Sequence, residues 1–258
     1  MPDSITRLNK NYYYMFGILL LVLLWQLLAE QYPQVLVPSP YETWQGLVNI
    51  WTNGALGDNL KISFWRQITG MSIGLLIGLT SGMLAGWFSR LELLIQPLVN
   101  LLLAMPPIIL AVMAMVWFGM GTKMTVFLVA LLVFPIMHTN TVEGFKSIDP
   151  TIIQMSKVYR LPLPLAICKI YIPGMLHSLI AGFSMGAASS IRLTVMAELL
   201  GAREGMGQQI SISRSYLETE QLFAWVLVLL FILASLEFVL IRPLQRWSSR
   251  GTADAGSR

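Results

Sequence analysis

Long apolar runs separated by short polar segments dominate this sequence. Six runs are long enough to cross a bilayer, which takes ~20 mostly apolar residues, and they lie at 12–28, 64–88, 93–120, 124–142, 173–200 and 222–241. Pro106, Pro107 and Pro135 fall inside two of them. Such prolines are tolerated where neighbouring helices satisfy the freed carbonyls. The pattern predicts an all-α, polytopic membrane protein of about six transmembrane helices in a packed bundle.

The first run could be a cleaved signal peptide or a retained span. Residues 12–28 are longer than a usual signal core, and no small-x-small cleavage site follows them. We therefore interpret the run as a span and expect 1–258 to form a single transmembrane domain. Pro38 and Pro40 then precede 41–51, which is predicted to be a short amphipathic helix anchored at the interface by Trp44 and Trp51.

Composition and charge support a membrane protein. Residues are 55% hydrophobic and 12% charged, whereas soluble domains carry about 25% charged residues. With the N-terminus in the cytoplasm, eleven of the 17 Lys and Arg residues face inward and six face outward, so both termini are predicted to be cytoplasmic. No basic aromatic cluster indicates a nucleic-acid partner. The chain has one cysteine, Cys168, and two histidines, His138 and His177, which we expect at the membrane interface. These residues are too few to predict a metal site.

The second run carries an unusual series of glycines. Its segment GMSIGLLIGLTSGMLAG places them at spacing four, at Gly70, Gly74, Gly78, Gly82 and Gly86. In lipid, small residues let helix backbones approach closely, and a spacing of four marks a slanting groove for another helix. We expect a close neighbour along most of this helix, from packing within the chain or from a subunit interface.

The fifth run repeats this spacing with polar residues. The row consists of Ser178, Gly182, Gly186, Ser190, Thr194 and Glu198. Arg192 lies about 120° round the helix from Glu198, so the two are not expected to pair. Ionisable groups at membrane depth are candidates for a pathway. Ser190, Arg192, Thr194 and Glu198 are therefore candidate translocation residues, and the alternative is that Arg192 and Glu198 lie at the outer interface.

The polar loop at 143–172 is predicted to contain two short helices. Asp149 can cap a helix that starts at Pro150, and the second helix is expected over 163–170. One side of the first helix is apolar through Ile152, Ile153, Met155, Val158 and Tyr159. This arrangement favours a docking surface for another protein.

The same loop resembles the signature of permease subunits of bacterial binding-protein-dependent ABC importers. That signature reads EAA, three residues, Gly, nine residues, Ile, one residue, Leu, Pro. The corresponding positions are Gln154, Met155, Ser156, Arg160, Ile170, Ile172 and Pro173; Gln154 replaces Glu and Arg160 replaces Gly. The segments VPSP, WFGMG, AELLGAREGMG and PLQRW resemble the nitrate, sulfonate and taurine branch of these permeases.

The resemblance implies a type I ABC importer permease bundle in the bacterial inner membrane. It implies a second permease subunit, expected as a homodimer, two cytoplasmic ATPases that hold ATP and Mg, and an external solute-binding protein. The loop at 143–173, with Tyr159, would couple the chain to the ATPases. The segment GMGTK at 119–123 lacks the adjacent Gly-Lys of a phosphate loop, so we expect no catalytic residue and no cofactor in this chain.

The substrate implied by the resemblance is a small anion such as nitrate, a sulfonate or taurine, which would suit Arg192. Related permeases also carry neutral vitamins. A secondary transporter driven by an ion gradient is the alternative function, although no clear repeated halves are visible. An intramembrane enzyme is a third possibility, but no Ser/His pair and no HExxH helix appears.

Overall fold

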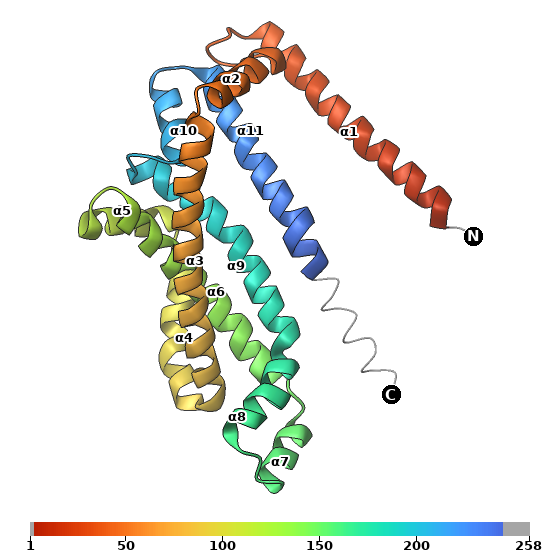
Figure 1. The fold of residues 1–258 in the computed structure, drawn as a ribbon, viewed down its shortest axis with the longest axis vertical. Helices are drawn as coiled ribbons and strands as arrows, with labels where there is room; N and C mark the ends of the chain where they lie inside the picture. The colour runs from red at the N-terminus through yellow and green to blue at the C-terminus, as the bar shows by residue number, and fades with distance from the viewer. Residues whose placement is uncertain (1–2, 245–258) are drawn as a thin grey trace. The chain divides into compact units, whose positions relative to one another are not determined.

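The computed structural model describes residues 3–244, in which helices are joined by short turns and no strand occurs (Figure 1). The α-helices are α1 Asp3–Gln31, α2 Pro40–Thr52, α3 Ala55–Trp87, α4 Ser89–Ala104, α5 Pro107–Phe118, α6 Thr122–Lys146, α7 Pro150–Val158, α8 Leu163–Ala166, α9 Ile172–Gly201, α10 Met206–Ser215 and α11 Thr219–Leu236. Two π-helical segments, η1 Ile167–Tyr171 and η2 Glu237–Ile241, extend the set. The predicted all-α fold is confirmed.

Two compact units divide the chain. One comprises the residues up to Asp58 together with Gln209–Leu229, and the other comprises Asn59–Gln208 with the residues from Leu230 onward. In the first unit, the Trp25 indole stacks on Phe223 and donates a hydrogen bond to the Pro38 carbonyl at 2.9 Å. Ser39 caps α2 in a reciprocal capping box with Glu42, which fixes the start of the predicted interfacial helix.

Four helical stretches in the described residues are long and apolar enough to cross a membrane. They are Ala55–Trp87, Thr122–Lys146, Pro164–Gly201 and Thr219–Leu244. A fifth crossing is possible if α4 and α5 count as one broken span. The predicted run at 12–28 falls in α1, whose apolar part Met15–Gln31 is a shorter helix.

The predicted run at 93–120 is two helices rather than one. The axes of α4 and α5 differ by 103° across the break at Met105 and Pro106. Pro106 and Pro107 lack amide hydrogens, and their rings block continuation of α4, so the backbone turns there. Pro107 then serves as the first residue of α5.

The glycine series of α3 lies against α6. A Cβ atom built on Gly78 would lie 2.7 Å from the Met137 Cβ and 2.7 Å from the Phe134 carbonyl oxygen. The other glycines meet α6 in the same way, at successive positions four residues apart: Gly70 at Val129, Gly74 at Val133, Gly82 at Thr141 and Gly86 at Phe145. The groove is therefore filled by a helix of the same chain.

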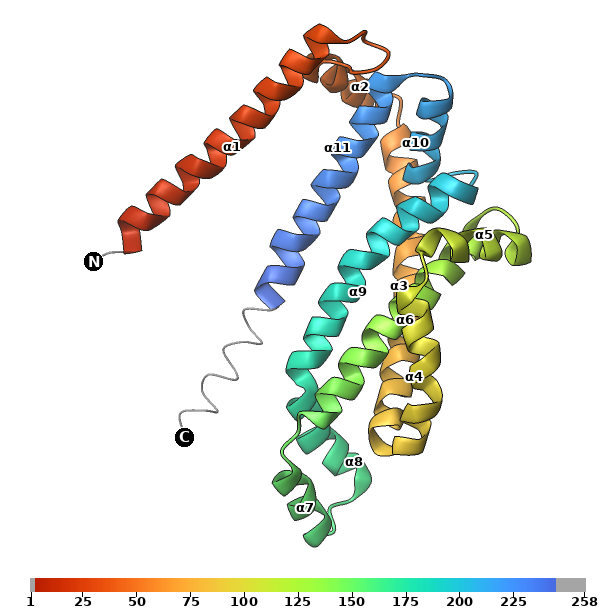
Figure 2. The same cartoon turned by 180° about the vertical axis from the view of Figure 1, so that it is seen from behind.

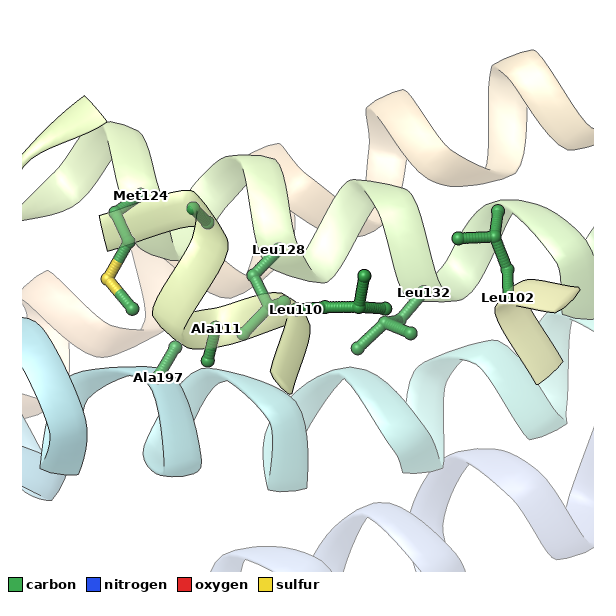
Figure 3. Packing of buried hydrophobic residues seen from close by; sticks show 8 residues of the cluster. Leu102, Leu110, Ala111, Met124, Leu128, Leu132 and Ala197 are labelled. Atoms are coloured by element: carbon green, nitrogen blue, oxygen red, sulfur yellow. The ribbon is translucent and has the colours of Figure 1, made fainter. Parts of the chain in front are cut away.

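Helix α6 is central to the second unit because α4, α5 and α9 also contact it (Figure 2). Figure 3 shows the main apolar cluster, to which α4, α5, α6 and α9 all contribute. Its buried members are Leu102, Leu110, Ala111, Ala114, Met124, Leu128, Leu132 and Ala197. The cluster packs beside the break between α4 and α5, where Met105 contacts it.

Candidate functional site

The segment between α6 and α9 contains the short helices α7 and α8. The Thr151 backbone N–H donates to the Asp149 Oδ1 atom at 2.8 Å. This bond lowers the pKa of the Asp149 carboxyl, and a hydrogen bond from the Thr151 hydroxyl lowers it further. A charged carboxylate at this helix N-terminus is favourable, so α7 starts at Pro150 as the sequence predicts. The second predicted helix, at 163–170, is divided between α8 and η1.

A tight turn ends α7 at Arg160. Its φ angle is +47°, in the left-handed region that glycine adopts most readily. The Leu161 N–H donates to the Ser156 carbonyl at 3.0 Å, which is the long hydrogen bond of a Schellman motif. The position that glycine occupies in the importer signature is therefore in a left-handed turn here, although it is arginine.

One side of α7 exposes apolar side chains. The exposed fractions are 46% for Ile152, 52% for Met155, 80% for Val158 and 72% for Tyr159, and we call these four residues the α7 face. A concentration of exposed apolar residues marks an interaction surface. Of the other predicted loop residues, Gln154, Arg160, Ile172 and Pro173 are exposed, Ile170 is half-buried and Ser156 is buried.

The opposite side of α7 is tied to the ends of longer helices. Ile153 packs against a buried cluster that contains Ile148, Tyr171 and Met175. The Tyr171 ring lies 5.2 Å from the Trp87 ring of α3 and 5.1 Å from the Phe145 ring of α6, measured between centroids. The loop is thus packed onto the same ends of α3 and α6 at which the glycine series finishes.

A buried ion pair joins α3 to α9. The Arg66 side chain is 4% exposed and that of Glu198 is 0% exposed, and the Arg66 Nη1 atom donates to the Glu198 Oε1 atom at 2.9 Å. The Ser63 hydroxyl donates to the Glu198 Oε2 atom at 2.7 Å, and the Arg66 Nε atom donates to the Thr122 hydroxyl at 3.0 Å. Charges this deeply buried need a close partner and further hydrogen bonds to offset the cost of leaving water.

The network also holds the loop between α9 and α10. The Arg66 Nη1 atom donates to the Glu204 carbonyl at 2.6 Å, and the Gly207 N–H donates to the Glu198 Oε2 atom at 3.1 Å. The Gly205 N–H donates to the Asn59 side-chain oxygen at 2.9 Å. Gly205 has a φ angle of +109° and lies against the Glu198 carboxylate, which leaves no room for a side chain.

The four predicted pathway residues do not gather at one place. Ser190, Thr194 and Glu198 are buried on the α3 side of α9, where Ser190 accepts a 3.2 Å hydrogen bond from Gln67. Arg192 points elsewhere and is exposed. As expected, Arg192 and Glu198 do not pair with each other. The burial of Glu198 is inconsistent with an exposed position at the outer interface.

Sequence reasoning missed two features of this region. Arg66, one of the six Lys and Arg residues predicted to face outward, was not expected to pair with Glu198, because helix geometry relates Glu198 only to residues of its own helix. Sequence reasoning also expected His138 at the interface, whereas His138 is fully buried and its Nδ1 atom lies 2.9 Å from the Ser81 hydroxyl of α3. For the ion pair, the available signal was the position of Arg66 within the apolar run at 64–88.

Arg192 borders a cavity of about 250 Å³ beside the break between α4 and α5. Ser189 is the other polar side chain in its lining. The remaining lining residues are apolar: Leu102, Leu103, Met105, Pro107, Leu132, Ile136 and Leu193. The cavity therefore combines one cation with apolar walls.

The fold is similar to that of type I ABC importer permeases. A chain of the inward-facing methionine ABC transporter MetNI matches with a TM-score of 0.57 at 17% identity, covering 70% of this chain and 93% of that one. A chain of an amino acid ABC transporter crystallised with histidines matches with a TM-score of 0.62 at 14% identity, covering 79% and 96%. At these identities, the likeness shows the fold alone.

The chain belongs to the family of binding-protein-dependent transport system inner membrane components, whose profile matches residues 74–252. The aliphatic sulfonates permease SsuC of Escherichia coli is 31% identical over 194 residues, 72% of this chain and 70% of that protein. SsuC of Bacillus subtilis is 26% identical over 225 residues, 85% and 82%. The taurine permease TauC of Escherichia coli is 24% identical over 215 residues, 81% and 78%. The family resemblance found in the sequence is confirmed, and the chain is a multi-pass ABC permease.

Proposed function

We propose that this chain forms the transmembrane pathway of an ATP-driven importer for a small organosulfonate, such as taurine or a short alkanesulfonate. The relatives named for aliphatic sulfonate and taurine transport support this substrate class. None of these three is named for nitrate transport, so the proposal narrows the anion class expected from the sequence.

The α7 face is the observation on which the proposal of ATP coupling rests. Its four exposed apolar residues lie in a loop that packs onto long helices. A partner that covers this face would bury apolar surface, which is the main favourable term in protein association. The loop at 143–173 is therefore the proposed docking site for a separate ATPase subunit.

Movement of α7 would reach the membrane helices through direct contacts. Tyr171 and Phe145 stack with a centroid distance of 5.1 Å, and Trp87 packs on both rings. Close-packed interiors transmit displacement because they have few voids. Displacement of the loop would shift the ends of α3, α6 and α9 together, which is the coupling that an ATP-driven pathway requires.

The proposed importer contains several subunits with separate roles. A second permease copy completes the pathway, two cytoplasmic ATPases bind ATP and Mg, and an external binding protein delivers the solute. Catalysis and the binding of ATP and Mg are assigned to the partner subunits. The loop and both termini lie in the cytoplasm, and residues 1–258 act as one transmembrane domain.

The test is uptake by the reconstituted importer carrying Met155→Glu in the α7 face. A charge buried in an interface core disrupts docking, and loss of an interface hot spot costs ~2 kcal/mol or more. ATP-driven taurine or butanesulfonate uptake should fall by about tenfold or more, with a smaller loss of ATP hydrolysis. Uptake and phosphate release are measured in the same proteoliposomes.

Arg90→Glu is the matched control, because Arg90 is exposed and lies outside the loop. It should leave the ratio of solute transported to ATP hydrolysed unchanged. Normal uptake and a normal ratio in Met155→Glu would remove the assignment of the α7 face.

A further inference from the structure

We propose that the cavity beside Arg192 is a solute site of this chain itself, and that it selects organic anions with a short apolar tail over inorganic anions. This inference rests on the proposed function and specifies how its substrate is recognised. Specificity would then lie partly in the permease and not only in the external binding protein.

The charge of the cavity determines the sign of its ligand. Arg192 is exposed, and it takes part in none of the ion pairs formed by the residues that the structure describes. The lining contains no carboxylate that could neutralise it. A guanidinium group can bind a sulfonate or carboxylate through two parallel hydrogen bonds, and the Ser189 hydroxyl offers a further donor at the same wall.

The remaining walls favour a hydrocarbon tail. Leu102, Leu132, Ile136 and Leu193 come from three helices and present aliphatic side chains to the cavity. Each methylene group buried against such walls is worth roughly a fourfold gain in affinity. Nitrate and sulfate have no apolar part, so they would gain only from the polar groups of Arg192 and Ser189.

The size and position of the cavity suit a small transported solute. Its volume of about 250 Å³ lies just below that of pockets for drug-sized ligands, which span roughly 300–1,000 Å³. Met105 and Pro107 place the broken backbone between α4 and α5 at its edge. Irregular backbone at membrane depth is tolerated where it is buried in protein or lines a wet cavity, and discontinuous helices commonly form transport sites.

The test uses the single native cysteine of the chain. Cys168 is exposed, and Cys168→Ser removes the background thiol before Ser189→Cys places one at the cavity. The full chain in nanodiscs is labelled with 2-sulfonatoethyl methanethiosulfonate, which is anionic, or with its trimethylammonium analogue, which is cationic. Arg192→Gln should lower the anionic-to-cationic rate ratio by about tenfold, as expected for loss of one nearby charge.

Two further variants separate the charge effect from a folding defect. Arg192→Lys should keep most of the rate ratio, because it preserves the cation. Arg90→Gln makes the same substitution at an exposed arginine outside the cavity and should leave the ratio unchanged. Equal ratios with and without the charge at Arg192 would overturn the proposal.

Protection by free anions tests the apolar walls. Butanesulfonate should slow labelling of the Ser189→Cys thiol more strongly than methanesulfonate, and nitrate and sulfate at the same concentration should protect least. Arg192→Gln should abolish the protection by butanesulfonate. Equal protection by nitrate and butanesulfonate would overturn the selectivity claim.

The labelling experiment needs no ATPase, so its result can contradict the cavity assignment without contradicting the proposed function. Selective protection in a chain that supports no ATP-driven uptake would contradict the importer and support the cavity assignment. ATP-driven sulfonate uptake through a chain whose cavity shows no charge preference would contradict the cavity assignment alone.

Discussion

Glu198 and Arg66 organise the polar groups around them as a single unit. Both side chains are almost fully buried, and Ser63, Thr122, Glu204 and Gly207 form further hydrogen bonds with them. The desolvation of two charges can outweigh their attraction unless the geometry and the extra hydrogen bonds are good. The network therefore fixes one arrangement of α3, α9 and the following loop more than it adds stability.

This interpretation predicts non-additive effects of removing the two charges. Arg66→Met and Glu198→Leu should each destabilise the chain by about 3–5 kcal/mol, because each leaves a buried charge without its partner. The double variant should be more stable than either single variant. Denaturant-induced unfolding of the purified chain in detergent measures all three.

The exposed pair of Lys146 and Glu92 provides the control. Lys146 is 58% exposed, and surface pairs of this kind contribute about 0–1 kcal/mol. Lys146→Met should therefore change stability little. Additive losses at Arg66 and Glu198 would show that the two residues do not form a coupled pair.

The sequence indicated Glu198 as a functional candidate but could not identify its partner. Arg66 lies 132 residues earlier in the chain, and helix geometry relates only residues within one helix. The left-handed turn at Arg160, which accompanies the Schellman hydrogen bond, was likewise not predicted, because arginine does not favour that conformation.

Between helices, the close approach of α3 and α6 depends on the absence of side chains at one row of positions. Atoms of α6, including carbonyl oxygens, occupy the space where Cβ atoms would lie. Backbone atoms cannot yield as a flexible side chain can. Glycine has a low helix propensity, but at these positions it allows α3 and α6 to stay in contact along their length.

Gly78→Ala and Gly57→Ala form a matched test of this packing. The new Cβ atom at Gly78 would lie 2.7 Å from the Phe134 carbonyl oxygen, whereas nothing lies within 4 Å of the position at Gly57, in the same helix. Gly78→Ala should destabilise the chain by about 1–3 kcal/mol through overpacking. Gly57→Ala should be neutral or stabilise it by up to ~1 kcal/mol, because alanine favours helix.

Thermal unfolding in a fixed detergent measures both glycine variants. A Gly78→Ala protein as stable as Gly57→Ala would show that the two helices separate without cost. That result would remove the packing role of the glycine series.

Hydropathy located most of the long helices, since burial in lipid imposes long apolar runs, but it joined α4 and α5 into one run. The glycine spacing also indicated that a neighbour lies close. It could not show that this neighbour is α6, because a groove describes one helix surface and not its partner. Nor did Pro106 and Pro107 specify the bend of 103°, which depends on how α5 packs against α6 and α9.

For the molecule as a whole, the features fit a transmembrane pathway whose movement is driven by separate ATPase subunits. The α7 face is the proposed docking surface, and aromatic packing links its loop to α3 and α6. The cavity at Arg192 lies against α4, α6 and α9. A shift of these helices would therefore change the surroundings of the cavity, as alternating access requires.

The most direct test of ATP-driven import is butanesulfonate uptake into liposomes under two driving forces. The chain reconstituted with its ATPase and binding-protein partners should accumulate the sulfonate only when ATP is supplied. The chain alone should accumulate none under a proton or sodium gradient. Concentrative uptake by the chain alone, driven by either gradient, would contradict the account and establish a secondary transporter.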